Sequence, residues 1–352
     1  MNLLLAFSAS HRARLLGHRE PVMRIAVWVK DVFPVLRERL GKEEEWGRDE
    51  VVMANIMLAS LEIISPGTFE VPGISWQNHL QMARQMIIRR GGLHPVPRAG
   101  SPFHGDAREE KDEKVARFMM RWFAYLDVLG SLSGNKNDTP LSAAYFTTPP
   151  GDDDLQIDCL LGFTGRCISI LARIAGLAKI CEEQRIDEQG NVREDWRLED
   201  PDIRIQANSL LRELEEGLGM RMQYKGCQCS SNRSQSPGFG STFDEAESGW
   251  DAVEIYATNE MFHWAGLIHL YRRVLGRKRE DPGVQNAVRE IVALLYKVRR
   301  GSTAEACLLF PMFTAGCDAL DLGQREKIVE RLRVVEEFGM TQVSFTEIFI
   351  FY

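Results

Sequence analysis

The sequence lacks three patterns that would each point to a particular class of protein. No apolar run approaches the roughly 18 residues that a helix needs to cross a bilayer, and almost no segment alternates apolar and polar residues as a half-buried strand does. A basic excess is also missing, because 43 lysines and arginines stand against 50 acidic residues, for a formal charge of −7. We therefore predict no membrane partner, no sheet, and no surface that binds nucleic acid by charge alone.

The seven cysteines show no spacing that would bind zinc. Cys227 and Cys229 are the only close pair, and a tetrahedral site needs a second pair of ligands. The pattern CxxCxxxxxxC does not occur anywhere in the chain. We interpret the cysteines as reduced thiols and predict no metal site.

The short motifs of common catalytic sites are absent as well. There is no HExxH, GxSxG or GxxxxGK[ST], and the acidic residues 152–154 with Asp158 do not complete the magnesium-binding motif DDxxD. His263 and His269 share one helical pattern but lie about 240° apart around its axis, so they cannot chelate one metal ion. We predict no catalytic residue, no cofactor or cofactor-binding residue, and no enzymatic activity.

Residues 259–275 form the most informative segment that is present. The segment reads NEMFHWAGLIHLYRRVL, and its apolar residues recur every three or four positions with few polar residues between them, which predicts a buried helix. We expect Trp264 to be almost fully buried, so that its replacement by alanine would destabilise the protein by about 3–5 kcal/mol. The next apolar run, LLFPMFTAGC at 308–317, is expected to break at Pro311.

Helical patterns of the same kind fill the rest of the chain. The clearest of them occupy residues 49–67, 75–92, 111–134, 162–184, 202–218, 281–301 and 323–339. Their spacing follows no fixed period, which argues against a regular solenoid. The sequence therefore predicts an all-α protein, an irregular multi-helix domain of about ten helices that extends over residues 1–352 as a single domain.

Three segments between these helices are rich in Gly, Pro, Ser and Asp. Such segments bury too little apolar area to offset the entropy lost on ordering. We predict long, mobile surface loops within the domain at residues 94–110, 135–154 and 226–248.

A cluster of five cations follows the apolar helix: Arg272, Arg273, Arg277, Lys278 and Arg279. Cations at a helix C-terminus complement its negative end, which is the structural interpretation. The functional interpretation is a nuclear-import signal or a phosphate contact. No other candidate site residue is predicted, and none that would contact DNA.

The order of the helical segments resembles a known family. The resemblance, from about residue 3 to about residue 340, rests on LLLAFSASHRARLL, IMLASLEII followed by SWQNHL, RWFAYLDVLGSL, GFTGRCISILARIAGLA, MFHWAGLIHLYRRVL and LLFPMFTAGCDA, in that order. This series is similar to the fungal-specific transcription factor domain, the C-terminal regulatory region of fungal binuclear zinc cluster transcription factors. Each motif alone is a weak signal, whereas their shared order is fairly specific.

The resemblance implies a nuclear, all-helical domain that regulates transcription by RNA polymerase II and contacts the transcription machinery. It also implies dimerisation, either with a second copy of the chain or with an intact zinc-cluster factor. The six cysteines that such factors use to hold zinc and read DNA are missing from this sequence. DNA binding is therefore expected only indirectly, through a partner or through a zinc cluster upstream of these residues.

Two other functions remain open at the level of sequence. The chain would also suit a helical scaffold or adaptor with no link to transcription, which only localisation and partners distinguish from a regulator. A helical metabolic enzyme acting on a hydrophobic small molecule is the third alternative. The lack of paired carboxylates or histidines at working distance argues against it.

Overall fold

The computed structural model describes residues 1–65, 76–90, 107–133, 156–158, 161–185, 198–219 and 243–337, with single positions between 187 and 196. Within these ranges the chain is all-α, with twelve α-helices and one isolated bridge between Ile157 and Thr164. The predicted fold class is confirmed. The chain divides into two compact units, chiefly Met1–Asp127 and Val128–Val335. The organisation as a single domain stays a prediction.

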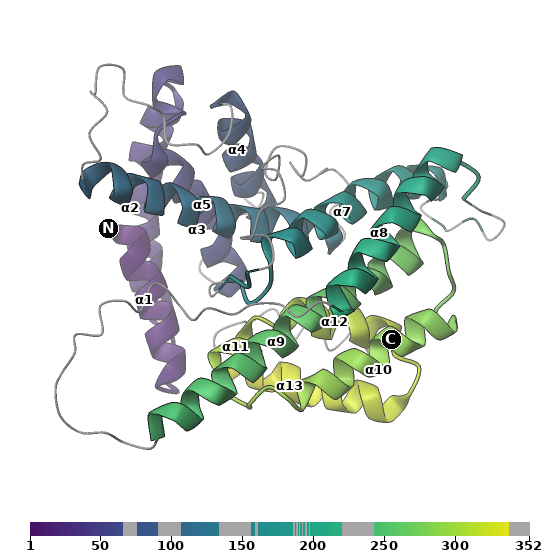
Figure 1. The fold of residues 1–352 in the computed structure, drawn as a ribbon. Helices are drawn as coiled ribbons and strands as arrows, with labels where there is room; N and C mark the ends of the chain where they lie inside the picture. The colour runs from purple at the N-terminus through teal and green to yellow at the C-terminus, as the bar shows by residue number, and fades with distance from the viewer. Residues whose placement is uncertain are drawn as a thin grey trace. The chain divides into compact units, whose positions relative to one another are not determined.

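The first unit is built from helices that pack in neighbouring pairs (Figure 1, purple and blue). Helix α1 packs on α2, both contact α3, and α3 pairs with α4. The elements are α1 (Asn2–Leu15), α2 (Val22–Leu40), the 3-10 turn η1 (Glu43–Glu45), α3 (Asp49–Ile64), α4 (Trp76–Arg89) and the larger part of α5 (Ala107–Leu132). Helix α2 was not among the helices predicted from the sequence.

A buried ion pair lies within the apolar core of this first unit. Arg84 of α4 donates from Nε to Oδ1 of Asp127 on α5 at 2.9 Å, and a second guanidinium nitrogen of Arg84 contacts the same oxygen. Asp127 has no solvent exposure, and apolar side chains such as Met86 and Phe123 are equally enclosed. A charge so far from water needs its partner, so the pair joins α4 to α5 in one arrangement.

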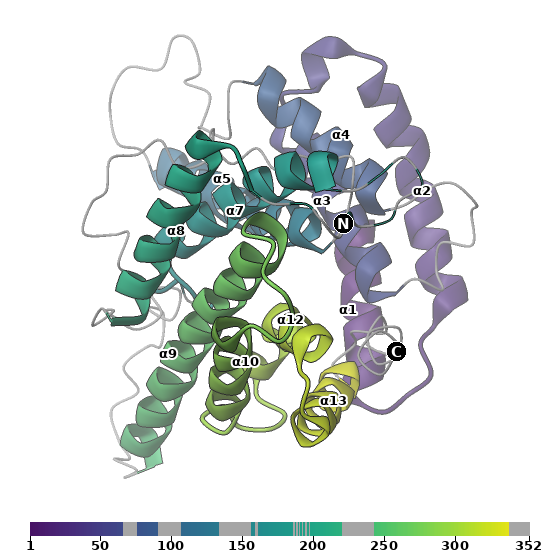
Figure 2. The same cartoon turned by 90° about the vertical axis from the view of Figure 1, so that its right-hand side faces the viewer.

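The second unit is assembled around α9, as the sequence predicted for its apolar segment. Helix α9 contacts α7, α8, α10, α11 and α12, and Figure 2 shows it running beside α10. Met261, Phe262 and Ala265 on α9 have no solvent exposure. The elements are α7 (Gly165–Arg185), α8 (Pro201–Gly219), α9 (Phe243–His269), the π-helix η5 (Leu270–Val274), α10 (Pro282–Leu295), α11 (Thr303–Ala306), α12 (Leu309–Asp318) and α13 (Leu322–Glu337).

Aspartates fix where several helices of the second unit begin. Asp200 accepts hydrogen bonds from the backbone N–H groups of Asp202 and Ile203, and Asp281 accepts one from Gly283 at 2.8 Å. Each aspartate is followed by a proline in the first helical position, where no N–H is needed. The Asp-Pro pairs therefore set the starts of α8 and α10.

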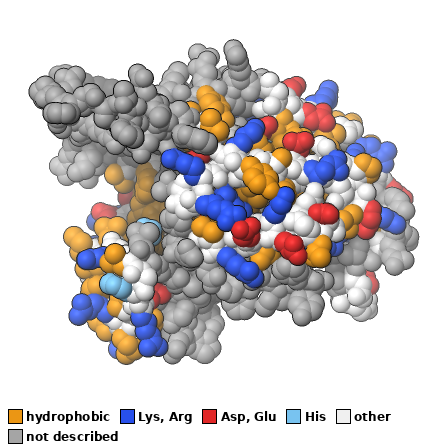
Figure 3. Space-filling model, turned by 90° about the horizontal axis from the view of Figure 1, so that it is seen from below, with side chains coloured by type: hydrophobic (Ala, Val, Ile, Leu, Met, Phe, Trp, Pro, Cys, Tyr) orange, Lys and Arg blue, Asp and Glu red, His pale blue; other side chains and the backbone are white. Residues whose placement is uncertain are grey.

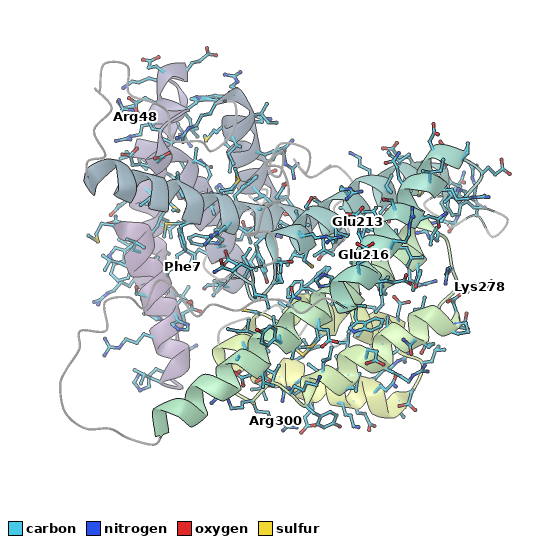
Figure 4. The ribbon with its side chains drawn as sticks, in the orientation of Figure 1. Phe7, Arg48, Glu213, Glu216, Lys278 and Arg300 are labelled. Carbon is cyan, nitrogen blue, oxygen red and sulfur yellow. The ribbon has the colours of Figure 1, made fainter. Side chains whose placement is uncertain are left out.

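The outer faces of α7 and α8 are joined by exposed ion pairs. Arg173 of α7 makes two contacts with the carboxylate of Glu213 on α8, at 2.7 and 2.9 Å. Arg166 reaches Glu216, one turn further along, at 3.0 Å. Figure 4 shows both glutamates on the side of α8 that faces α7. These pairs are open to water, so each contributes less than about 1 kcal/mol to stability.

Two predictions about the apolar segments were wrong. Residues 308–317 do not break at Pro311, because this proline lies in the first turn of α12, where its missing N–H would have had no acceptor. Trp264 is half-buried rather than almost fully buried, although its Nε1 is enclosed. Trp264→Ala is accordingly expected to lower the free energy of unfolding by less than the truncation of a fully buried side chain would.

The predicted loops lie largely outside the described residues, with corrections at two of their ends. The prediction for 94–110 is wrong from Ala107 onward, because α5 begins there with a run of good helix formers, AREEK. The prediction for 226–248 is wrong from Phe243 onward, where α9 begins with acidic residues that suit a helix N-terminus. The segment 135–154 is outside the described residues throughout.

Candidate functional site

A change of helix type marks the region where the second unit forms a pocket. Helix α9 passes into the π-helix η5, with Leu275 donating its N–H to the carbonyl of Leu270 at 2.9 Å. A π-turn is wider than an α-turn and is frequently found at functional sites. Gly276 then ends the helix at φ +63°, and a Cβ there would lie 2.6 Å from the ring of Trp196. The positive φ and the lack of space for a Cβ both restrict this position to glycine.

A cavity of about 290 Å³ opens beside this π-helix. Its walls come from α7, from the end of α9 with η5, from α12 and from the end of α5. The volume is close to the lower end of ordinary small-molecule pockets, roughly 300 Å³. The space therefore suits a small ligand rather than a peptide or a helix.

Three arginines line this pocket, and two of them are held by a carboxylate. Arg272 donates from Nε to Asp318 at 2.7 Å, and Arg273 donates from Nε to Glu182 at 2.6 Å. Arg273 also donates to the carbonyl of Leu132 at 2.7 Å. These two guanidiniums are therefore fixed in place before any ligand arrives.

The third arginine, Arg185, is not paired in this way. It donates from Nη1 to the carbonyl of Arg272 at 3.0 Å, while its Nε is buried and has no hydrogen-bond partner among the described residues. Burial lowers the pKa of Arg185, and the charges of Arg272 and Arg273 lower it further, against the opposite effect of Glu182. An arginine stays protonated even so, which leaves a half-buried cation with N–H groups that have no acceptor among the described residues.

The pocket as a whole has an excess of one positive charge, since three guanidiniums face two carboxylates. His269 does not add to this charge, because burial and the nearby Arg273 lower its pKa to about 3. Burial raises the pKa of Asp318, although Arg272 acts in the opposite direction. The electrostatics of the pocket thus favour an incoming anion of low charge.

Aromatic side chains form the apolar wall of the pocket. The ring of His269 is stacked on Phe310 with centroids 5.3 Å apart and planes 8° from parallel, and its Nε2 lies 3.1 Å from the hydroxyl of Thr314. Phe313 lies on the same wall. A ligand here would meet both guanidiniums and apolar side chains.

The five cations predicted as a patch do not form one surface. Arg272 and Arg273 line the pocket, whereas Arg277 lies 4.2 Å from the ring of Tyr271 and 3.3 Å from Asp281. Arg279 donates to the carbonyl of Ala319 at 2.6 Å. Lys278 alone of the five is exposed, in the segment between η5 and α10 (Figure 4). Four of the five cations are thus engaged within the fold, and the nuclear-import interpretation of the cluster stays a prediction.

Arg185, Glu182 and Asp318 complete the pocket but were not among the residues predicted from the sequence. Arg185 is the last residue of α7 and sits 87 positions before Arg272. A single arginine in the last turn of a helix is expected for capping alone, so its sequence context carries no signal of a site. The packing of α7 against η5 and of α12 against α9 brings these residues together.

The described residues offer little support for other kinds of site. In these ranges no group of three or more His, Cys, Asp or Glu side chains is placed to hold a metal ion. His263 and His269 point apart as predicted, since His263 packs against Gly217 of α8 while His269 contacts Thr314 of α12. No helix in the described part of the chain is long and apolar enough to cross a membrane.

Comparison with known proteins places the chain in a family. No curated protein and no solved structure matches it. The sequence pattern of the fungal specific transcription factor domain, by contrast, matches residues 1–346. The match extends through both compact units and agrees with the all-α fold. The chain therefore belongs to the fungal specific transcription factor domain family, whose members act in the regulation of transcription.

Proposed function

We propose that this chain is the regulatory part of a fungal zinc-cluster type regulator of transcription by RNA polymerase II, and that it acts in the nucleus. The observation that carries the proposal is the family match over residues 1–346. The all-helical fold is consistent with the family match and supports the proposal. The chain serves as a scaffold that receives and transmits a signal.

DNA recognition is assigned to another module or to a partner of this chain. The sequence contains no CxxCxxxxxxC, and its formal charge of −7 opposes the neutralisation of phosphates. On the face that Figure 3 shows, the cations and carboxylates of the second unit are interspersed rather than separated by sign. A zinc cluster outside this sequence, or dimerisation with itself or with an intact zinc-cluster factor, would bring the domain to DNA.

The decisive experiment tethers the chain to a promoter. Residues 1–352 are fused to an unrelated DNA-binding domain in a fungal cell that carries an RNA polymerase II reporter with the matching site. We expect reporter mRNA to rise or fall relative to the DNA-binding domain alone, and to stay unchanged on a promoter without the site. A nuclear fusion that leaves the reporter unchanged would contradict the proposal and favour the scaffold or adaptor function.

The basic cluster is tested separately through its exposed member. Lys278→Glu reverses one charge without touching the contacts of the four arginines, and Lys297→Glu is a matched control on another exposed lysine. Because the arginines are engaged within the fold, we expect the same nuclear fraction of a fluorescent fusion for both variants and the natural chain. A loss of nuclear signal in Lys278→Glu alone would instead support the nuclear-import interpretation.

A further inference from the structure

We propose that the arginine-lined pocket of the second unit binds a small monocarboxylate with an apolar body, and that Arg185 is its anchor. The proposal rests on the cavity and on Arg185, the lining arginine that has no carboxylate partner among the described residues, and it is independent of the role in transcription. Only the use of the ligand as an effector rests on the proposed function.

The anchor is identified by what the fold leaves unsatisfied. Arg272 and Arg273 each have a carboxylate partner, whereas Arg185 has none among the described residues, and its Nε is buried without an acceptor. Its Nη2 has no acceptor among the described residues either and is not enclosed, so its N–H groups are open to a ligand in the cavity. A guanidinium matches the planar geometry of a carboxylate, which accepts two parallel hydrogen bonds.

The charge of the ligand follows from the carboxylates in the same pocket. Glu182 and Asp318 already neutralise two of the three guanidiniums, which leaves an excess of one positive charge. A dianion such as hydrogen phosphate would place its second charge near these carboxylates and be repelled. A single carboxylate balances the pocket without this repulsion.

The apolar body of the ligand follows from the apolar residues of the lining. Phe310, Phe313 and Ile268 line the cavity, and the ring of His269 is uncharged at neutral pH. A ligand that fills about 290 Å³ beside these side chains removes apolar surface from water, which favours binding. Acetate is too small to use this wall, whereas a phenyl or branched aliphatic carboxylate reaches it.

The test measures binding of defined probes to the purified full chain by calorimetry and thermal shift. The probes are acetate, 3-methylbutanoate, phenylacetate, the neutral analogue 2-phenylethanol, and inorganic phosphate. We expect saturable binding of phenylacetate and 3-methylbutanoate, much weaker binding of acetate and 2-phenylethanol, and none of phosphate. Failure of every carboxylate to bind, or equal binding of phosphate or the neutral alcohol, would overturn the proposal.

Variants separate the anchor from the fold around it. Arg185→Gln should weaken phenylacetate binding by about 10- to 100-fold, the range of a hydrogen bond to a charged group. Arg173→Gln is the matched control, since it removes a cation from the same helix at an exposed position outside the pocket. Equal affinities for the two variants would refute the assignment of Arg185.

A second variant keeps the test valid if Arg185→Gln does not fold. Cys317→Phe fills the cavity from α12 and leaves all three arginines in place. It should abolish binding of the carboxylates while the protein still unfolds cooperatively. Unchanged binding in Cys317→Phe would place the ligand elsewhere and reject the pocket.

Binding that persists while the tethered reporter stays silent would uphold the site and reject only the transcriptional role.

Discussion

Replacing Arg331 with methionine is expected to lower the free energy of unfolding by about 3–5 kcal/mol, the range measured when one partner of a buried ion pair is removed. Arg331 of α13 places its Nε 2.6 Å from Oε1 of Glu305 on α11, and the side chains are 9% and 0% exposed. The variant leaves the carboxylate of Glu305 enclosed without its counter-charge. Urea denaturation followed by tryptophan fluorescence measures the loss.

This pair closes the second unit around the loop that follows α10. Glu305 accepts a hydrogen bond from the N–H of Gly301 at 2.6 Å, and Arg331 donates to the carbonyl of Val298 at 2.8 Å. Ser302 begins α11 by accepting the N–H of Glu305. One buried carboxylate and one guanidinium thus satisfy backbone groups of the loop.

The loss of free energy of unfolding in Arg331→Met should depend on pH in a defined direction. Burial raises the pKa of Glu305, while the N–H of Gly301 and the charge of Arg331 lower it. Removing Arg331 raises the folded-state pKa further above the unfolded value. A group with a raised folded pKa contributes stability that is present at low pH and lost as pH rises through the folded pKa. The difference in free energy of unfolding between the variant and the natural chain should therefore be smaller at pH 5 than at pH 8.

A neighbouring pair provides the matched control for this prediction. Arg300 and Glu330 join the same loop to the same helix at 2.7 Å, but their side chains are 57% and 56% exposed. Arg300→Met should change the free energy of unfolding by less than about 1 kcal/mol. The double variant Glu305→Gln with Arg331→Met should recover much of the loss, because no buried charge remains. Equal effects of Arg331→Met and Arg300→Met would contradict the buried-pair account.

Periodicity in the sequence was enough to locate most of the longer helices of the second unit and its core. The apolar residues around Phe262 placed α9 at the centre, because a helix buried on most sides has few polar positions. This pattern does not depend on which helices surround it. The same reasoning could not detect the π-turn at Leu270–Val274, since one extra residue per turn leaves the local composition unchanged. It also misjudged Pro311, because a proline breaks a helix only beyond the first turn.

The pocket was harder to predict because its chemistry is distributed over the chain. The cluster that includes Arg272 and Arg273 was visible as local charge, but its members point to different partners in the fold. Arg185 and Glu182 belong to α7, whose amphipathic pattern explains them fully as a helix end. Long-range packing, rather than local pattern, decides which cations share a cavity.

Replacing Gly217 with alanine is expected to destabilise the protein by about 1–3 kcal/mol, although glycine-to-alanine changes within helices normally stabilise by up to about 1 kcal/mol. Gly217 lies near the end of α8, where a Cβ would be 2.5 Å from Nε2 and 2.6 Å from Cδ2 of His263 on α9. Contacts this short cannot be accommodated unless the ring moves. Thermal and urea denaturation of the purified chain measure the change.

The ring of His263 is not free to move away. Its Nδ1 donates to the carbonyl of Asn259 at 2.8 Å, and the residue is 1% exposed between the helices. Burial lowers the pKa of His263, so the ring is neutral and its Nε2, without a partner among the described residues, packs directly on the glycine. The helices α8 and α9 therefore approach at a point that only a residue without a side chain permits.

Two comparisons distinguish this steric clash from a general sensitivity of the helices to glycine-to-alanine substitution. Gly176 in the middle of α7 has nothing within 4 Å of a built Cβ, so Gly176→Ala should stabilise the protein by roughly 0.5–1 kcal/mol. In a His263→Ala background the ring is gone, and Gly217→Ala should change sign and become stabilising. If Gly217→Ala is destabilising by the same amount with and without the ring, the clash is not its cause. A reversal of sign would show that the contact between one imidazole and one glycine sets the distance between α8 and the central helix.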